Sequence, residues 1–578
     1  MVTHPSASIR LAVSSFKEPN TGRVRGHPFK KADDLQVNEL ITADCYPVTI
    51  APGLNRLFVD FCAGTLPNFL PSMENWQQRP PLPAHWPELV RILAAQNPSA
   101  SSAPALAALE KGAGTILTGQ QVGLFGGPLY TPYKAATAIA RARTGTACGS
   151  PFVAVFWLAT EDHDFAEINQ VTFPAGRELA QLTYDHAPSV ALPAGRIVFD
   201  DSITLLAERA AELLGPSDAT NALVAAYRPG QTFAQAFAGF YSRIFAAQGL
   251  LIVDANSREI HRLGAPVLRA AIERADELHA ALLERSRALE AAGYHAQVMV
   301  ADESSLLFLL NEQIDEQTGA RLALKRIAPS AAEPNGLWHA GTQKYSTADL
   351  VALLDAQPER ISPAALLRPV FQDFLFSTST QIGGPAEIAY LAQSAVLFER
   401  IGLVNGGRQT PPMPRFSATL IEPSVDNLLR KHELALEQIF AEENAASLAL
   451  RLAARAMPPE TKIRLAAAGN ALDAELTELV DWMQGQDKGL GQSADTAAGK
   501  IRYQMNRLRT LAANFQLQKE STLSRHAESI MQSIYPGGVL QERVHGAAYY
   551  FARYGLDLAE TLCEQAANLQ PGHAAIWL

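Results

Sequence analysis

The sequence predicts an α/β protein in which a doubly wound core with insertions is followed by a long α-helical coiled-coil domain. Apolar runs of strand length alternate with helical segments over roughly 300 residues, the order expected when helices cover a mainly parallel sheet. Beyond residue 423, apolar residues recur at alternating spacings of four and three, which is typical of a coiled-coil seam.

Composition indicates a multidomain globular protein. At 578 residues the chain is too long for one hydrophobic core, and 48% hydrophobic with 18% charged residues is ordinary globular composition. A net charge of −10 argues against a general nucleic-acid binder, which would carry a basic surface. The four cysteines lie far apart with no Cys-x-x-Cys pair, which suits a reducing cytoplasm and gives no zinc-site spacing: Cys45, Cys62, Cys148 and Cys563.

Neither a signal peptide nor a membrane span is expected. The N-terminal stretch has no sustained apolar core, and no uninterrupted apolar run is long enough to cross a bilayer. We therefore expect a soluble, cytoplasmic protein without nucleic-acid or membrane partners.

The stretch Thr115–Ala138 is the first candidate for a ligand site. Thr115–Leu117 predicts a buried strand, four glycines follow (Gly119, Gly123, Gly126 and Gly127), and a helix is expected from about Pro132 to Arg143. A strand, a glycine-rich turn and a helix start can hold an anion on backbone N–H groups. The pattern is neither the dinucleotide fingerprint nor the phosphate loop that ends in Lys-Ser or Lys-Thr, so it does not identify the ligand.

An acidic loop, Thr160–Asn169, follows the next predicted strand, Phe152–Leu158, whose continuous apolar run is typical of a parallel strand covered on both faces. Because ligands of open parallel sheets bind at the carboxyl ends of strands, this loop and the glycine loop are expected to face one crevice. Its candidates for substrate binding, metal binding or acid–base chemistry are Glu161, Asp162, His163 and Asp164. The alternative is a polar loop that caps the following helix. A metal is disfavoured because no second His or Cys cluster accompanies the loop.

More alternating elements complete the predicted core. Helices are expected over 232–248 and 266–292, and strands over 250–254 and near 297–300, 306–310 and 322–325. The segment Arg368–Ser377 is interpreted as a further strand, with a helix that runs on to Arg400. Between them, Gly383-Gly384-Pro385 repeats Gly126-Gly127-Pro128, so two helix N-termini are expected to line one site.

Four polar residues in these apolar elements have two interpretations each. Lys134 either reaches an anion at the helix start or is solvated, whereas its neighbour Tyr133 is expected in the core. Arg368, Gln372 and Asp373 are either an internal ion pair or site residues, because unpaired charge in an apolar strand costs free energy, and we favour the site.

The region from Asp426 to Ser533 is predicted to be helical in three segments, 426–456, 462–484 and 498–533. The seam residues are Leu465, Leu472, Leu476, Leu479 and Met483, then Ile501, Met505, Leu508, Ala512 and Phe515. The turn Met457–Glu460 suggests an antiparallel hairpin, and a glycine-rich stretch over 484–499 separates the last two helices. A dimerisation arm is favoured over a cofactor-binding bundle.

Five segments of the chain, taken together, resemble the cysteine ligase family of bacillithiol biosynthesis (BshC). They occur in the family's order between about residues 10 and 570: Thr118–Tyr130, Phe156–Phe165, Leu367–Asp373, Gln381–Tyr390 and Tyr535–Val544. The resemblance implies a Rossmann-like core of the class I nucleotidyltransferase and aminoacyl-tRNA synthetase type over 1–422, with connecting insertions at roughly 175–235 and 255–365. It also implies an antiparallel coiled-coil domain over 423–533 that forms a homodimer, and a C-terminal segment, 534–578, that returns to the core.

The reaction implied by the resemblance joins cysteine to the amino group of glucosaminyl-malate. Because an amide requires an activated carboxyl, ATP is the expected cofactor; whether ADP or AMP is released stays open, and Mg²⁺ could accompany the nucleotide. The synthetase signatures His-x-Gly-His and Lys-Met-Ser-Lys-Ser are absent, and Gly127–Tyr130 occupies the place of the first, so how cysteine is activated is open. A non-catalytic nucleotide- or metabolite-binding scaffold of the same pathway, or a nucleotidyltransferase with another acceptor, are the alternatives.

The expected catalytic residues are Glu161, Asp162, His163 and Asp164, one of which would act as the base for the amine. Lys134 and Arg368 are expected to hold carboxylate or phosphate. The expected substrate- and nucleotide-binding residues are Thr118, Gly119, Gln120, Gln121, Gly126, Gly127, Tyr130, Lys134, Arg368, Gln372, Gly383, Gly384, Glu387 and Tyr390.

Overall fold

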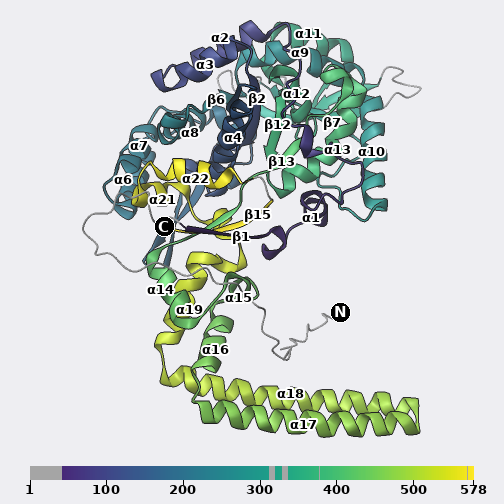
Figure 1. Cartoon of the computed structure of the whole chain (residues 1–578). Helices are drawn as coiled ribbons and strands as arrows, with labels where there is room; N and C mark the ends of the chain where they lie inside the picture. Colours follow the sequence, from purple (N-terminus) through teal and green to yellow (C-terminus); the bar gives the residue numbers. More distant parts are fainter. Residues whose placement is uncertain (1–41, 177, 312–318, 328–335, 377, 569–570) are drawn as a thin grey trace. The chain divides into compact units, whose positions relative to one another are not determined.

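A five-stranded parallel sheet forms the centre of the fold (Figure 1). The computed structural model describes residues 42–176, 178–311, 319–327, 336–376, 378–568 and 571–578. The strands, in spatial order, are β13 (Pro412–Pro414), β12 (Thr378–Gly383), β2 (Gly114–Gln120), β3 (Phe152–Leu158) and β6 (Leu251–Asp254). The chain runs outward from β2 to β6 and then returns to the other side of β2. The strand order therefore reverses between β2 and β12, which is where open α/β sheets bind ligands.

Strand β3 has the predicted bounds and is buried along its whole length. Its side chains alternate between the two faces of the sheet. Trp157 packs edge-on against Phe371 of α12 (Arg368–Phe376), whereas Phe156 stacks with Tyr241 of α8 (Phe233–Ile244). The continuous apolar run thus reflects a strand covered by a helix on each face, as predicted.

The other helices around this sheet are α2 (Trp86–Gln96), α3 (Ala103–Glu110), α4 (Tyr130–Ala147), α9 (Arg258–Glu273) and α13 (Pro385–Ile401). Leu89 of α2, Val267 of α9 and Leu397 of α13 belong to one buried cluster with Leu117 and Val155 of the sheet. Helix α4 begins at Tyr130 and ends at Ala147, so it is longer at both ends than predicted.

Two long excursions interrupt the core. Between β3 and α8 lie α5 (Phe165–Ile168), β4 (Gln170–Ala175), β5 (Glu178–Thr183), α6 (Ser202–Leu214) and α7 (Asp218–Ala226). Between α9 and α12 lie α10 (Ala275–Ala291), β7 (Ser304–Asn311), β8 (Ala320–Ile327), β9 (Leu337–Ala340), β10 (Gln343–Tyr345), α11 (Thr347–Ala356) and β11 (Ile361–Pro363). The strands of the second excursion form an antiparallel sheet in the order β10-β9-β8-β7-β11.

Three predicted elements of the core are wrong. Arg368–Ser377 is not a strand, because residues 368–376 form helix α12. This helix is buried on nearly every side, and an apolar run without periodicity cannot distinguish such a helix from a buried strand. The expected helix over 266–292 is two helices, α9 and α10, that meet at Arg274, and the described residues 297–300 belong to no strand.

A three-stranded sheet joins distant parts of the chain. β15 (Gly572–Trp577) lies between β1 (Thr42–Pro47), to which it is antiparallel, and β14 (Ala418–Ile421), to which it is parallel. It is preceded by α20 (Gln541–Val544), α21 (Ala547–Tyr554) and α22 (Leu558–Ala566), and α22 packs on α4 of the core.

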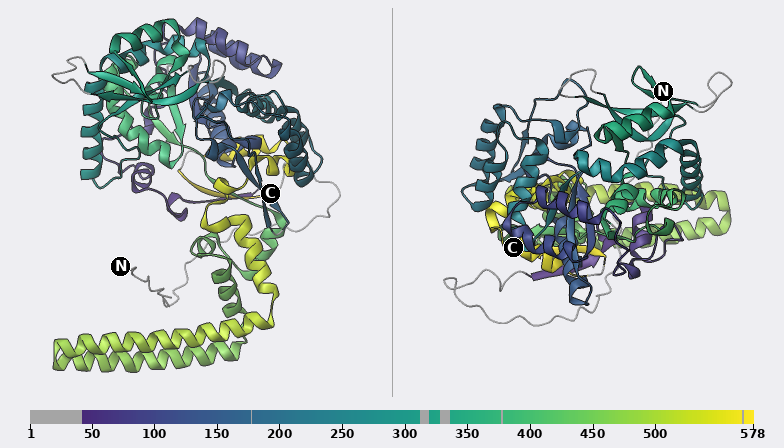
Figure 2. Two further views of the ribbon diagram at one scale, coloured as in Figure 1. Left: turned by 180° about the vertical axis from the view of Figure 1, so that it is seen from behind. Right: turned by 90° about the horizontal axis from the view of Figure 1, so that it is seen from above.

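The remaining helices form a helical arm: α14 (Pro423–His432), α15 (Leu436–Phe440), α16 (Ala445–Ala456), α17 (Pro459–Gln486), α18 (Lys488–Lys519) and α19 (Thr522–Ile534). Helices α17 and α18 pack side by side as an antiparallel hairpin (Figures 1 and 2). Arg502 pairs with Asp473, and Gly469 lies so close to the Arg509 guanidinium that a Cβ would clash. No helix of the described residues is both long enough and apolar enough to cross a bilayer.

The hairpin turn differs from the predicted one. It lies at Asp487, whose side chain caps α18, and most of the glycine-rich stretch over 484–499 is the first part of α18. The Pro458-Pro459 pair only separates α16 from α17, because α16 packs on α18 and α19 while α17 continues along α18. Prolines in a first helical turn lose no hydrogen bond there, so they mark a helix start but not a reversal of the chain.

Candidate functional site

A cavity of about 260 Å³ lies at the carboxyl ends of β2 and β12, where the strand order reverses. We call it the catalytic cavity after the function proposed for it below. Its polar lining residues are Thr118, Gln120, Gln121, Tyr130, Lys134, Asp162, Arg368, Gln372, Gln381, Glu387, Tyr390, Arg415 and Arg543. Gly119, Gly383 and Gly384 also line it. The segments expected to share one crevice therefore do so, although Gly126, Gly127, Glu161, His163 and Asp164 are outside the lining.

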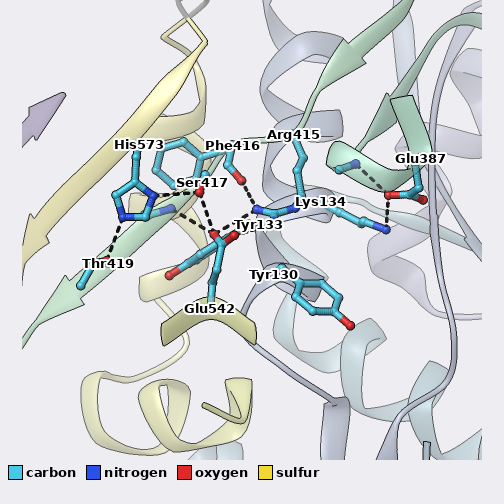
Figure 3. A network of polar contacts seen from close by, with 12 residues as sticks. Tyr130, Tyr133, Lys134, Glu387, Arg415, Phe416, Ser417, Thr419, Glu542 and His573 are labelled. Carbon is cyan, nitrogen blue, oxygen red and sulfur yellow. Dashed lines mark hydrogen bonds and ion pairs between the residues drawn. The ribbon is translucent and has the colours of Figure 1, made fainter. Parts of the chain in front are cut away.

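Lys134 is buried on the cavity wall, and Figure 3 shows its ammonium group beside the Glu387 carboxylate. Its ammonium group donates to Gly119 O at 2.8 Å and to Gln120 Oε1 at 2.7 Å, and it lies 2.6 Å from Glu387 Oε2. Burial lowers the pKa of Lys134, and the Glu387 carboxylate only partly offsets this effect. Because an ammonium group has three N–H donors and three acceptors surround it, Lys134 is neither solvated nor free to bind an anion without displacing one of them.

The second Gly-Gly-Pro motif does start a helix, but its N-terminus is already occupied. Gly384 is the N-cap of α13, and its N–H donates to Glu387 Oε2 at 2.7 Å. A Cβ on Gly384 would lie 3.3 Å from Arg415 Nε, so glycine leaves room for the charged network around it. The carboxylate of Glu387 therefore takes the place at which a substrate anion was expected.

The first Gly-Gly-Pro motif is turned away from the cavity, contrary to expectation. Gly126 has a φ of 87°, its N–H donates to the Tyr227 hydroxyl, and its carbonyl accepts from the Tyr241 hydroxyl. Gly127 N–H donates to Leu124 O. Because these groups are paired within the chain, they provide no anion-binding loop; the glycines serve a tight buried turn instead.

Asp162 is the member of the acidic loop that lines the catalytic cavity. It accepts from Gln121 Nε2 at 2.8 Å and from the His163 N–H at 2.8 Å. Burial acts to raise the pKa of Asp162, but the Gln121 hydrogen bond and the charges of Arg321 and Arg368 outweigh it, so the pKa is lowered. The carboxylate therefore stays ionised and is suited to bind a cationic or hydrogen-bond-donating group.

The other three acidic-loop residues have different surroundings. Glu161 is buried with Oε1 2.7 Å from His261 Nε2, which makes it part of an internal pair. His163 Nδ1 lies 3.2 Å from Arg321 Nη1, and burial together with the Arg321 charge lowers the pKa of its imidazole. Asp164 is exposed at the start of α5 and makes no side-chain capping bond.

Arg368 lies at the start of α12 and lines the cavity together with Tyr390. Burial acts to lower its pKa, but Tyr390, which it hydrogen-bonds, and the carboxylates of Asp162 and Glu387 raise it overall. Gln372 also lines the cavity, one turn further along α12. Asp373, by contrast, points to a different cavity, although its Oδ1 accepts from Gln381 Nε2 at 2.7 Å.

Two arginines of the cavity escaped prediction. Arg415 follows the short strand β13 and forms a buried bidentate pair with Glu542, which also accepts from the Ser417 hydroxyl (Figure 3). Arg543 lies next to Glu542 and is exposed at the cavity. A charged residue directly after a parallel strand was a usable signal for Arg415, whereas Arg543 comes from a helix that only the tertiary fold brings here.

A second cavity of about 420 Å³ adjoins the catalytic one. Both are lined by Pro385, Ala386, Arg415 and Arg543. The adjoining cavity also includes Gln297, Tyr535 and His573. Together the two cavities offer a space large enough for more than one small molecule.

Two family models match consecutive parts of this fold. The N-terminal Rossmann-like domain of bacillithiol biosynthesis BshC matches residues 60–405, and the C-terminal coiled-coil domain of BshC matches residues 418–578. The chain belongs to the BshC family. The matches cover the central sheet with both excursions, and then β14, the helical arm and the segment through β15. The fold predicted from the sequence, an α/β core of Rossmann type with a coiled-coil domain, is therefore confirmed.

Curated relatives in the family are named as candidate cysteine ligases, BshC. The protein of Koribacter versatilis is 40% identical over 547 residues, which covers 92% of this chain and 99% of the relative. That of Solibacter usitatus is 34% identical, with 81% of this chain and 85% of the relative covered. That of Salinibacter ruber is 30% identical, with 77% and 80% covered.

Proposed function

We propose that this protein is an ATP-dependent ligase that joins the carboxyl group of cysteine to the amino group of glucosaminyl-malate. The observation that carries the proposal is the charge pattern of the catalytic cavity in a member of the BshC family. One lining contains an ionised carboxylate, Asp162, together with the cations Arg368, Arg415 and Arg543. An acceptor with both an amine and carboxylates would find a partner for each of these groups.

The proposed reaction has two steps. A cysteine carboxylate oxygen attacks a phosphorus atom of ATP, which releases pyrophosphate or ADP and leaves an acyl-adenylate or acyl phosphate. The amine nitrogen then attacks the activated carbonyl carbon, an amide forms, AMP or phosphate leaves, and the amine proton passes to a base or water. Arg368 and Arg543 would stabilise negative charge, and Asp162 would hold the amino group in place.

The two adjoining cavities support this assignment by their size. The catalytic cavity alone, about 260 Å³, is small for several substrates, whereas the adjoining cavity adds about 420 Å³ across the shared wall formed by Arg415 and Arg543. We propose that the malate carboxylates lie at this shared wall and that the amine reaches Asp162.

The test is an assay of purified protein with cysteine, glucosaminyl-malate and ATP, in which the new thiol is detected by mass spectrometry. Product that depends on ATP is expected. Asp162→Asn should reduce the rate about 100-fold, by loss of a positioning contact in the active site. The matched control is Asp201→Asn, an exposed aspartate at the start of α6. Absence of product with all three substrates would refute the proposal in this form.

A non-catalytic scaffold remains the second candidate because the sequence lacks both class I synthetase signatures. Replacing the gene by a variant with Asp162→Asn and His163→Ala separates the two functions. Restored thiol levels in the cell would favour the scaffold and count against catalysis at this loop.

We further propose that the helical arm forms a homodimer. The buried seam of α18 includes Gly491, Ala498 and Met505, which recur every seven positions, and Gly491 lies against Gln484 of α17. A second stripe on α18 is exposed in the single chain: Ile501, Leu508, Leu511 and Phe515. Their spacings of seven, three and four are those of a coiled-coil face, so the arm has one apolar seam for its own hairpin and another for a partner copy.

A further inference from the structure

The two neighbours of Asp162 in the acidic loop are held by side chains from elsewhere in the fold. The sequence predicts Glu161 and His163 as catalytic residues, yet neither lines the catalytic cavity, whereas Asp162 between them does. Glu161 is buried, and His163 is partly buried. Each of them contacts a buried basic residue outside the loop: His261 of α9 beside Glu161, and Arg321 of β8 beside His163.

His261 has an oxygen atom at each of its ring nitrogens. Nδ1 lies 2.9 Å from Ile361 O and 3.1 Å from Pro358 O, and Nε2 lies 2.7 Å from Glu161 Oε1. Because carbonyl oxygens only accept, Nδ1 carries a proton, and the Glu161 carboxylate favours a second proton on Nε2. Burial acts to lower the pKa of His261, but the carboxylate and the two carbonyls outweigh it, so the pKa is raised. The ring is therefore an imidazolium.

His163 has the opposite surroundings. Its Nδ1 lies 3.2 Å from Arg321 Nη1, and a guanidinium group has donors only. Nδ1 therefore accepts, and the neutral imidazole keeps its proton on Nε2. Burial and then the Arg321 charge lower the pKa of His163, and the charges of Asp162 and Asp164 do not offset them. The two histidines thus differ in charge because one faces a carboxylate and the other a guanidinium.

Both contacts depend on the short strand β11. His261 Nδ1 donates to Ile361 O, and Arg321 Nε donates to Ser362 Oγ at 3.3 Å, so consecutive residues of β11 hold the two basic side chains. The Arg321 guanidinium also lies over the Phe308 ring, 3.8 Å from its centroid, and the residue is only 8% exposed. These contacts fix the guanidinium, which can then fix the His163 ring.

The same contacts act on the Asp162 carboxylate. Asp162 Oδ1 accepts from the backbone N–H of His163 at 2.8 Å, so a fixed His163 also fixes this donor. Burial acts to raise the pKa of Asp162, but the Gln121 hydrogen bond and then the Arg321 charge outweigh it. Arg321 is not part of the cavity lining, so it affects the cavity through the acidic loop.

We propose that His261, Arg321 and β11 form a clamp that holds the acidic loop on both sides of Asp162. Glu161 and His163 are then positioning residues, and so are the two basic residues that hold them. The inference rests on the ligase function proposed above, in which Asp162 holds the amino group. With Nδ1 occupied by Arg321 and a proton on Nε2, His163 has no free lone pair for the amine proton, which passes to Asp162 or to water.

The first experiment is NMR of the full-length protein with ¹⁵N-labelled histidine, because ring nitrogen shifts distinguish an imidazolium from each neutral tautomer. At a pH of about 6.5, the ordinary histidine pKa, His261 is expected as an imidazolium and His163 as a neutral ring with its proton on Nε2. Glu161→Gln keeps the shape, removes the carboxylate, and should make His261 neutral at the same pH. His163→Gln assigns the other signal by its loss.

A second set of variants tests Arg321. Arg321→Gln should raise the midpoint of the His163 titration, because the guanidinium charge is gone. The matched control is Lys325→Gln, which removes a positive charge from an exposed side chain of the same strand and should leave the midpoint unchanged. A wild-type His163 with its proton on Nδ1, a neutral wild-type His261, or an unmoved His163 titration in Arg321→Gln would each overturn the inference.

The ligase assay adds a readout of Asp162. Arg321→Gln should lower kcat/KM for glucosaminyl-malate about tenfold and move the acid limb of its pH profile to higher pH, because Asp162 loses a nearby cation. Arg321→Lys keeps the charge and should restore the acid limb, whereas an acid limb that is the same in all three proteins would contradict the clamp. The NMR results require no turnover, so they decide on the clamp even if the protein makes no product.

Discussion

Replacement of Glu542 by glutamine should destabilise the protein far more than the same replacement at the surface. Glu542 is 1% exposed and accepts from Arg415 Nη1 at 3.0 Å, from Ser417 Oγ at 2.9 Å and from Ala418 N at 3.3 Å, with Arg415 Nη2 at 2.5 Å. Glu542→Gln keeps the shape but removes the carboxylate that pairs with the buried Arg415 guanidinium. Removing one partner of a buried pair costs about 3–5 kcal/mol.

The matched control is Glu560→Gln. Glu560 also pairs with an arginine, Arg143, at 2.5 Å, but the two side chains are 43% and 46% exposed. Exposed pairs contribute only about 0–1 kcal/mol. For a unit of 150–250 residues that unfolds cooperatively, a loss of 1 kcal/mol lowers Tm by about 2–4 °C. The buried substitution should therefore lower Tm by roughly 6–20 °C and the control by less than about 4 °C.

Thermal unfolding followed by circular dichroism measures both variants at pH 7. Arg415 lowers the pKa of Glu542 against the opposing effect of burial, so its stabilisation is present above the unfolded-state pKa and lost as pH falls through the folded-state value. The difference between wild type and Glu542→Gln should therefore shrink in acid. Equal Tm shifts for the two variants at pH 7 would refute the reasoning.

Three further predictions concern other parts of the fold. Lys134→Met leaves the Glu387 carboxylate without its cation and should reduce product formation about 100-fold in the mass-spectrometric assay, while an unchanged rate would exclude Lys134 from the site. Burial raises the pKa of Asp373 to about 7, so between its unfolded-state and folded-state pKa values the folded protein holds a proton that the unfolded chain releases. The Tm of the wild type should therefore fall from pH 5 to pH 8. Asp373→Asn should flatten this fall in parallel thermal scans. Leu508→Glu combined with Phe515→Glu places charge on the exposed stripe of α18 and should yield a monomer by light scattering, whereas an unchanged dimer would place the interface elsewhere.

The sequence pattern predicted those core elements whose run of apolar residues matches their burial in the sheet. The strand Phe152–Leu158 was recognised because a parallel strand covered on both faces is apolar throughout. The reversal of strand order then brought Lys134, Asp162 and Arg368 to one cavity, as expected for loops at carboxyl ends of strands.

The sequence pattern gave wrong or missing predictions where the surroundings of a side chain depend on elements far away in the sequence. Helix α12 resembled a strand because nearly every face of it is covered. The helix start at Gly384 resembled an anion site, but Glu387, three residues on, fills it. Arg543 was missed because its place in the cavity depends on how a segment after the helical arm packs.

The position of β15 in the middle of its sheet has a consequence for how the protein is made. Glu542 lies 127 residues beyond Arg415 in sequence, and β15, which holds β1 and β14 together, is made later still. A chain emerging from the ribosome can therefore form the central sheet before it can complete the cavity wall. Until Glu542 has been made and packed, Arg415 lacks the partner of its buried ion pair, and a chain interrupted in synthesis would carry an incomplete cavity wall.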